Sequence, residues 1–167
     1  SLAQSVMVAC DLVAVPKEVL SRTRELVGES IPGYTVSKIW MSATHTHTGP
    51  VFTEGVYEIP KEGVMQPREY VEFFSQRAAE GIVSAWNSRV RGKVGWGMAH
   101  AVVAQNRRSV YGDGTAVMYG PTAKDDFRMF EGYEDHGVDV LCAWNGEGKL
   151  VATAINTLPD ETLREAL

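Results

Sequence analysis

The sequence is poor in the features that mark several classes of protein. No apolar stretch approaches the roughly 20 residues that a helix needs to span a bilayer, so we expect no integral membrane segment. The start, SLAQSVMVACDL, lacks the charged n-region of a signal peptide, and the absence of an initial Met leaves room for an upstream segment. Lys and Arg number 16 against 21 Asp and Glu, without a basic stripe, so nucleic acid is not an expected partner.

Cysteine is also scarce, and both cysteines, Cys10 and Cys142, lie inside apolar runs. A free cysteine in such a run usually behaves as a small buried hydrophobic residue. The sequence therefore favours burial over a metal or redox role for these thiols, and it leaves the cellular compartment open.

What the sequence does have is an ordinary globular composition over 167 residues, with 44% hydrophobic and 22% charged residues. This length provides one sizeable core and is short for two domains. The chain has no internal repeats and no low-complexity tracts. We therefore expect a single domain over residues 1–167.

The beginning of the chain has the pattern of a strand, a helix and a second strand. Val6 to Cys10 is a short apolar run, residues 16–29 carry a helical apolar stripe, and Val36 to Ala43 is extended again. This order most often forms a right-handed βαβ unit with parallel strands. Asp11 and the segment from Thr44 onward would then leave the sheet at its carboxyl edge, where open α/β folds usually bind ligands.

The later part of the chain combines one long helix with several strands. Apolar residues recur every three to four positions over 67–91, and Gly92 fits the stop of this helix, while residues 50–66 predict a long loop. Residues 106–120 are glycine-rich and polar, which predicts another loop. Strand patterns occupy 93–104, 138–144 and 149–156, with a hairpin turn at 145–148 between the last two.

Together these patterns predict the fold class α/β. The expected architecture is a mixed β-sheet with a βαβ unit at the start, a long amphipathic helix and a carboxyl-terminal hairpin, with helices layered on the sheet.

The segment SATHTHTGP, residues 42–50, places two of the four histidines one residue apart. In an extended segment, positions i and i+2 face the same side, so His45 and His47 can direct two imidazoles into one pocket. Neutral imidazole is a common zinc ligand, and a catalytic zinc site needs about three protein ligands with one position left open. The pair therefore indicates metal binding, although histidines at a strand end with other partners have the same spacing.

Asp11 and two arginines are further candidates. Asp11 would lie near His45 in the βαβ unit, where it orients a ring N–H, binds the metal, or serves only as a helix N-cap or loop carboxylate. Arg107 and Arg108, after Asn106, offer planar donors suited to a carboxylate or an oxyanion, and paired arginines in a loop also form ordinary solvated surface.

The two remaining histidines have weaker patterns. His136 lies in the polar cluster EGYEDHGVDVL, which has ligand-capable residues in loop-like surroundings. His100, in WGMAHAVV, fits a core or strand-face position.

The run VMVACDL, the helix after it and the segment IWMSATHTHTGP resemble the amino-terminal part of the neutral/alkaline non-lysosomal ceramidase family, in its bacterial ceramidase-like branch. Members of that family carry a THTHSGP segment after the same arrangement. The resemblance continues through the long helix, AQNRRS and EDHGVDVLCAWNGEGKLVATAIN, so it covers nearly the whole chain. It implies that these residues are a fragment of a larger ceramidase-like catalytic domain.

That family hydrolyses the amide bond of N-acyl sphingosine with one zinc. The resemblance implies that His45 is a zinc ligand, that His47 helps to hold the substrate or the oxyanion, and that Arg107 or Arg108 lies near the scissile group. We therefore predict His45, His47 and Asp11 as metal-site residues, and His47, Arg107 and Arg108 as catalytic residues. The expected cofactor is zinc.

The sequence also departs from the family's pattern. The second zinc histidine of the family falls in the strand that here ends AINTLPDE, where Asn156, Thr157 and Asp160 stand. The family's Gly-Asp-Val-Ser-Pro-Asn segment, which bears the nucleophile, and its later Glu and Tyr ligands are absent from these residues.

The leading hypothesis is a zinc-dependent hydrolase of amide (N-acyl) bonds that acts on a small-molecule N-acyl substrate, with a lipid as one option. An amidohydrolase barrel also uses His-x-His, but it needs roughly 200 residues and an eightfold alternation of strands and helices. The alternative is a truncated or degenerate ceramidase-like domain without catalysis that serves in binding or assembly. A homo-oligomer is left open, and the resemblance implies a secreted or periplasmic location.

Overall fold

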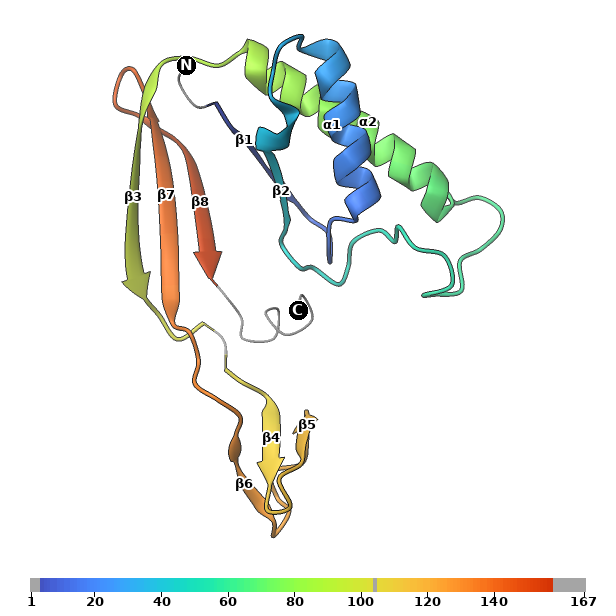
Figure 1. The fold of residues 1–167 in the computed structure, drawn as a ribbon, viewed down its shortest axis with the longest axis vertical. Helices are drawn as coiled ribbons and strands as arrows, with labels where there is room; N and C mark the ends of the chain where they lie inside the picture. The colour runs from blue at the N-terminus through green and yellow to red at the C-terminus, as the bar shows by residue number, and fades with distance from the viewer. Residues whose placement is uncertain (1–3, 104, 158–167) are drawn as a thin grey trace. The chain divides into compact units, whose positions relative to one another are not determined.

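The computed structural model describes residues 4–103 and 105–157. The chain folds as two compact units, Ser1–Arg89 and Val90–Leu167, and each is described by itself. Figure 1 shows the helices of the first unit and the antiparallel strands of the second. The expectation of a single domain within a larger catalytic domain stays a prediction.

The first unit contains the predicted βαβ arrangement. Strand β1 (Val6–Cys10) is followed by helix α1 (Lys17–Ser30), a short 3₁₀ turn (Val36–Lys38) and strand β2 (Ile39–Ala43). β1 and β2 pair in parallel, from Val6 opposite Ile39 to Cys10 opposite Ala43. The two strands therefore end side by side, and the segments that follow them leave the sheet at the same edge.

The long helix is α2 (Pro67–Asn87), and it ends four residues before the predicted Arg91. Ser88 closes the helix, since its backbone N–H and its hydroxyl both donate to the carbonyl of Ser84. Gly92 is the first residue of strand β3 rather than the helix stop that we expected. A Cβ at Gly92 would meet the carbonyl oxygen of Trp144 on the neighbouring strand, so close strand approach accounts for this glycine.

The core of the first unit lies between the two helices and the two strands. Val19 and Val27 of α1 are fully buried, as is Ile39 of β2. They belong to two neighbouring clusters, the first made of Cys10, Leu12, Val19 and Phe52, and the second of Val27, Ile39, Ala79 and Ile82.

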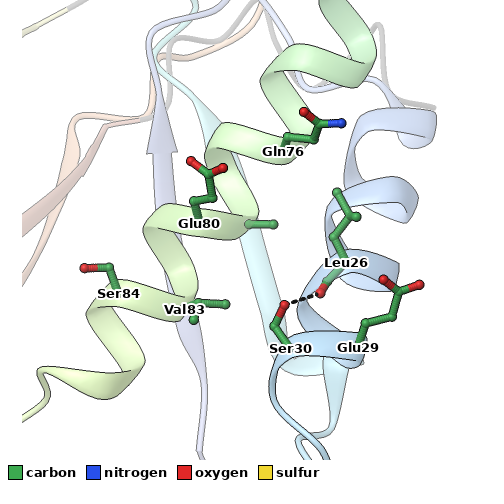
Figure 2. A pocket seen from close by; sticks show the side chains of 8 residues that line it. Leu26, Glu29, Ser30, Gln76, Glu80, Val83 and Ser84 are labelled. Atoms are coloured by element: carbon green, nitrogen blue, oxygen red, sulfur yellow. Dashed lines mark hydrogen bonds between the residues drawn. The ribbon is translucent and has the colours of Figure 1, made fainter.

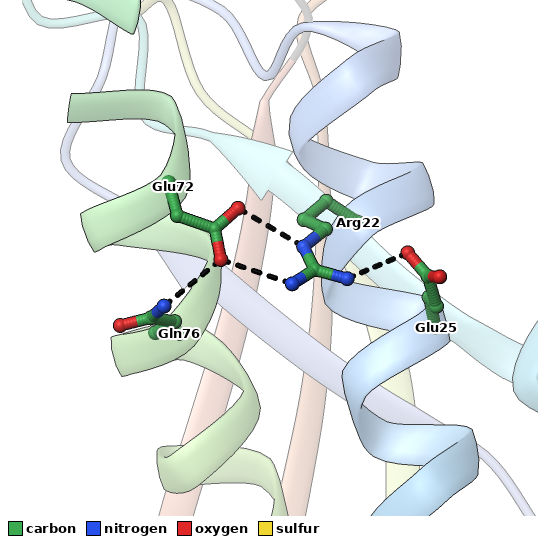
Figure 3. Close-up of polar contacts among 4 residues, drawn as sticks. All are labelled: Arg22, Glu25, Glu72 and Gln76. Atoms are coloured by element: carbon green, nitrogen blue, oxygen red, sulfur yellow. Dashed lines mark hydrogen bonds and ion pairs between the residues drawn. The ribbon is translucent and has the colours of Figure 1, made fainter. Parts of the chain in front are cut away.

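A polar contact also joins the two helices. Arg22 of α1 donates from Nε and Nη2 to the two carboxylate oxygens of Glu72 on α2, both at 3.0 Å (Figure 3). Gln76 donates to the same carboxylate at 2.9 Å, and Arg22 also reaches Glu25 at 2.8 Å. The hydrogen bonds from Arg22 lower the pKa of Glu72.

The second unit consists of two antiparallel sheets. In the larger sheet, β7 (Gly137–Asn145) lies between β3 (Gly92–His100) and β8 (Leu150–Thr157). The predicted hairpin between β7 and β8 is confirmed. The side chain of Asn145 accepts hydrogen bonds from the N–H groups of Glu147 and Lys149 in its turn, both at 3.0 Å.

The smaller sheet was not predicted. It has the order β5-β4-β6 and is built from β4 (Arg108–Tyr111), β5 (Ala116–Met118) and β6 (Phe127–Phe130). The prediction of a loop over 106–120 is therefore wrong. The turn between β4 and β5 explains Gly114, which has a φ of 83°, and in the same turn Asp113 accepts from the N–H of Thr115 at 2.9 Å.

The observed elements establish the α/β fold class that the sequence predicts, with parallel strands in the first unit and antiparallel strands in the second. Within the described part of the chain, neither helix is long and apolar enough to cross a bilayer.

Candidate functional site

The candidate site begins at the edge where β1 and β2 end together. The carbonyl of Cys10, the last residue of β1, accepts hydrogen bonds from the backbone N–H groups of Leu12 and Thr44, both at 2.9 Å. The Leu12 side chain is only 2% exposed and packs with Val19 and Phe52. Residues 11–13 therefore form a ledge that is anchored in the core and lies against the segment after β2.

Side-chain contacts tie the His-x-His segment to this ledge. The hydroxyl of Thr44 donates to Oδ1 of Asp11 at 3.1 Å. Gly49 lies so close to the ledge that a Cβ added there would stand 3.0 Å from the carbonyl oxygen of Asp11 and 3.3 Å from Cα of Leu12. Asp11 thus contacts the segment through both its carboxylate and its backbone.

His45 adopts a conformation that the sequence does not reveal. Strand β2 ends at Ala43, and His45 has a φ of 60°, so the expectation of an extended His-x-His segment is wrong. Nδ1 of His45 lies 2.8 Å from the carbonyl oxygen of Val13. A carbonyl only accepts, so Nδ1 carries the hydrogen, and in the neutral ring the lone pair lies on Nε2.

The two imidazoles still come together, although not by strand geometry. The ring centres of His45 and His47 are 5.0 Å apart with an angle of 86° between the planes, and both residues are exposed. This separation suits an edge-to-face ring pair. It also suits two ligands of one tetrahedral zinc, whose ring centres lie about 5 Å apart when each Zn–N distance is about 2.0 Å.

The histidine pair supplies two of the donors that a zinc site would need. Over residues 4–103 and 105–157, no group of three or more His, Cys, Asp or Glu residues is arranged to hold a metal ion. The pair offers two nitrogen donors, and a catalytic zinc takes about three protein ligands. A zinc ion bound by His45 and His47 would need a further donor from outside the described groups.

The two arginines of the prediction lie in the second unit and have different surroundings there. The guanidinium carbon of Arg107 lies 4.7 Å from the centre of the Tyr119 ring, and Tyr119 is 65% exposed. Tyr119 has a φ of 55° and donates its N–H to the carbonyl of Arg107 at 2.9 Å. Arg108 is in β4, where its Nε pairs with Glu131 at 2.9 Å.

A polar network fixes the loop that carries these arginines. Asn106 accepts at its side chain from the N–H of Arg108 at 2.9 Å and donates from its side chain to the carbonyl of Glu131. Its own N–H donates to the carboxylate of Glu134 at 2.8 Å, and this carboxylate lies 3.6 Å from Nε2 of His136. Glu134, in the polar cluster EGYEDHGVDVL, thus joins its segment to Asn106, and the ring of His136 lies beside the same carboxylate.

The remaining candidates are placed as follows. His100 is the last residue of β3 and is exposed. Asn156 and Thr157 end β8 opposite Asp139 and Val138 of β7. Asp160 lies outside the described residues.

The two cysteines differ in burial. Cys10 is 4% exposed, as predicted for a small core residue. Its burial and, to a smaller extent, the charge of Asp11 raise the pKa of its thiol. Cys142 of β7 is only half-buried, and its Sγ lies 3.9 Å from the hydroxyl of Thr153, its partner on β8.

An open groove of about 400 Å³ lies between α1 and α2 (Figure 2). Leu26, Ala79 and Val83 contribute apolar surface to it, and Glu29 and Glu80 contribute carboxylates. The groove is lined by the later turns of α1 and by α2, whereas the histidine pair follows the end of β2. It forms no part of the candidate site.

Some residues that contact the predicted site residues within each unit give no signal in the sequence. Val13 acts through its backbone carbonyl, which any residue would supply, and Tyr119 lies in a segment without a strand or helix pattern. Gly49 did give a signal, because we expected Gly49-Pro50 to end the strand, but its contact with residues 11 and 12 depends on the folded structure.

Comparison with known proteins adds information about the fold. No family model and no curated protein matches the chain. Among solved structures, the chain is similar to the crystal structure of neutral ceramidase from Pseudomonas aeruginosa, with a TM-score of 0.63 and 19% sequence identity. The match covers 93% of this chain and 24% of that chain, so the chain spans about a quarter of the length of that ceramidase. Nearly all of the chain therefore has a ceramidase-like fold.

Proposed function

We propose that this chain takes part in the zinc-dependent hydrolysis of N-acyl amide bonds, as the amino-terminal part of a ceramidase-like catalytic domain. The observation that carries the proposal is the His45–His47 pair at the carboxyl edge of β1 and β2, on a fold similar to that of a neutral ceramidase. A small-molecule N-acyl compound, such as an N-acyl lipid, is the proposed substrate.

The two histidines would act as ligands in this function. Val13 holds the His45 ring through Nδ1, which leaves the Nε2 lone pair for a metal ion. Zinc, when bound, would supply Lewis-acid polarisation of the scissile carbonyl. The ring of His47, 5.0 Å from that of His45, would bind the same ion or donate to the substrate oxygen.

We assign the proposed oxyanion role to Arg107 rather than Arg108. The guanidinium of Arg107 lies over the exposed ring of Tyr119, and a guanidinium is the group that forms bidentate contacts with oxyanions. Arg108 is bound to Glu131 within the second unit, so its replacement should act on stability. The Arg107→Ala variant should therefore lose more hydrolytic activity than the decrease in its folded fraction can account for.

The proposal is tested with an N-acyl sphingosine that carries a fluorescent acyl chain, incubated with Zn²⁺ and the complete catalytic domain of which we propose this chain to be the amino-terminal part. We expect release of the fluorescent acid that is lost in His45→Ala and retained in His100→Ala, since His100 lies at the end of β3 in the other unit. Acid release that persists unchanged in His45→Ala would contradict the proposal, and so would the absence of release from the unchanged domain.

One observation favours a second function. The described residues bring together two imidazoles and no third ligand. A ceramidase-like domain without catalysis, which serves in binding or assembly, would have this property. Binding of a non-hydrolysed N-acyl lipid by the unchanged chain and by His45→Ala alike, without acid release, would support this alternative.

A further inference from the structure

We propose that Asp11 is a positioning residue that holds His45 through Thr44, and that it is not itself a metal ligand. This inference rests on the proposed function, because it gives the carboxylate a role toward the ligand-bearing histidine. It follows from three features of the strand edge: the shared carbonyl of Cys10, the contact between Asp11 and Thr44, and the backbone conformation of His45.

The ledge at residues 11–13 is a rigid support. The carbonyl of Cys10 accepts from Leu12 on one side and from Thr44 on the other, so both segments are bound to one backbone oxygen. The buried side chain of Leu12 prevents the ledge from shifting without opening the core beside Val19 and Phe52. Groups that the ledge presents therefore have fixed positions.

His45 needs such a support. A non-glycine residue in the left-handed region is strained, and it persists where neighbouring contacts hold it. On the backbone side, the hydroxyl of the preceding residue, Thr44, donates to the Asp11 carboxylate at 3.1 Å. The contact on the ring side is the carbonyl of Val13 at 2.8 Å. The Asp11 carboxylate and the Val13 carbonyl, which hold Thr44 and His45, therefore both belong to the ledge.

The consequence for the imidazole is chemical as well as geometric. With Nδ1–H bound to Val13, the neutral His45 ring has its lone pair at Nε2, the form that binds a metal ion. If Thr44 loses Asp11, its N–H still donates to the carbonyl of Cys10, but its hydroxyl is no longer held, and we expect the His45 ring to be directed to Val13 less strictly. Both ring tautomers then become populated.

The competing role for Asp11 is direct ligation. That role would bring Asp11, His45 and His47 together as one group, and the described residues contain no such group of three. The Asp11 carboxylate is instead directed to the Thr44 hydroxyl through Oδ1. Asp11 therefore supports Thr44, the residue next to the proposed ligand His45.

Two substitutions at Asp11 separate these roles. Asp11→Asn keeps an oxygen that accepts from Thr44 and removes the charge, whereas Asp11→Ala removes the acceptor. Thr44→Val keeps the shape of the threonine and removes the donor. Asp113→Ala is the matched control, because Asp113 accepts from the hydroxyl of Thr115 at 2.7 Å in the second unit.

The first readout is the tautomer of His45 in the metal-free chain, from the ¹⁵N shifts of its ring nitrogens. We expect Nδ1–H in the unchanged chain, in Asp11→Asn and in the control, and a mixture of tautomers in Asp11→Ala and Thr44→Val. The second readout is Zn²⁺ affinity by calorimetry. We expect Asp11→Asn to remain within about twofold of the unchanged chain, and Asp11→Ala and Thr44→Val to bind roughly 10-fold more weakly or worse, the usual effect of removing a group that orients a ligand.

The double variant Asp11→Ala, Thr44→Val should bind Zn²⁺ no more weakly than either single variant, because each removes the same contact. Weak Zn²⁺ binding by Asp11→Asn with an unchanged tautomer would overturn the inference in favour of direct ligation. An unchanged tautomer in Thr44→Val would overturn it as well. If the unchanged chain binds no Zn²⁺, the proposed function fails, while the tautomer measurement still decides whether Asp11 positions His45. Amide spectra and thermal melts of each variant show whether it is folded.

Discussion

Replacing Gly49 with alanine tests the contact between the His-x-His segment and the ledge. The added Cβ would stand 3.0 Å from the carbonyl oxygen of Asp11 and 3.3 Å from Cα of Leu12. Carbon atoms pack best at about 3.5–4.0 Å, so the methyl group overlaps the backbone of the Asp11–Leu12 peptide. The carbonyl of Cys10 and the buried Leu12 side chain hold this backbone, and it cannot yield by a simple rotamer change.

Overpacking of this kind typically costs about 1–3 kcal/mol. A change of 1 kcal/mol shifts the Tm of a domain of 60–100 residues by about 4–8 °C, and the first unit is of this size. We therefore expect Gly49→Ala to lower the Tm of the first unit by roughly 5–20 °C. The ring of His45 should also lose its contact with Val13 in part.

Gly81→Ala provides a control of opposite sign. Gly81 lies in the interior of α2, is exposed, and has no atom within 4 Å of an added Cβ. Alanine there should stabilise the helix by about 0.5–1 kcal/mol. Thermal and urea melts followed by helical circular dichroism measure both variants. A Gly49→Ala protein as stable as the unchanged chain would refute the rigid ledge.

Three further predictions concern the core and two titrating groups. Ile39→Ala removes a fully buried side chain and should cost about 2–5 kcal/mol in urea denaturation, and a smaller loss would place Ile39 outside the core. Arg22 lowers the pKa of Glu72, so the ionised carboxylate stabilises the fold above the ordinary pKa of glutamate, and this contribution is lost as the pH falls through the lower folded value. Melts of Glu72→Gln between about pH 7 and pH 3 should therefore depend less on pH than those of the unchanged chain, and equal slopes would contradict the ion pair. Burial and the charge of Asp11 raise the pKa of the Cys10 thiol, so iodoacetamide should alkylate it more slowly in the folded chain than in urea. Alkylation should be somewhat faster in folded Asp11→Asn than in the folded unchanged chain. Equal rates in all three samples would contradict the environment described for this thiol.

Much of the first unit could be predicted from the sequence because its signals are local. The apolar run at Val6–Cys10 and the helical stripe of α1 depend on neighbouring residues only, and the order of these elements determines that the strands are parallel. The meeting of Asp11 with Thr44 at the carboxyl edge follows from that topology.

The conformation of His45 could not be predicted in this way. We expected the two imidazoles to lie together because side chains alternate along a strand. They do lie together, but the strand ends at Ala43, before both histidines, so alternation is not the cause. The ring is held by the backbone carbonyl of Val13. Every residue has such a carbonyl, so the residue type at this position does not indicate the contact. The left-handed φ of His45 is a property of the folded edge and not of the local sequence.

The second unit was harder to predict because its short strands have weak periodicity. Strands β4 to β6 contain three or four residues each, too few for a clear alternation, and their turns are rich in glycine. The two adjacent arginines illustrate the same limit. Sequence treats Arg107 and Arg108 alike, whereas the fold pairs one with Glu131 and lays the other over Tyr119.

The most direct test of the account is the zinc content of the chain after purification without chelators, measured beside His45→Ala, His47→Ala and the control His100→Ala. We predict about one zinc per chain in the unchanged protein and in the control, with loss of the metal in His45→Ala and a large decrease in His47→Ala. Zinc that remains bound in His45→Ala, or an unchanged protein that takes up no zinc even when Zn²⁺ is supplied in excess, would contradict the claim that this histidine pair is a ligand segment.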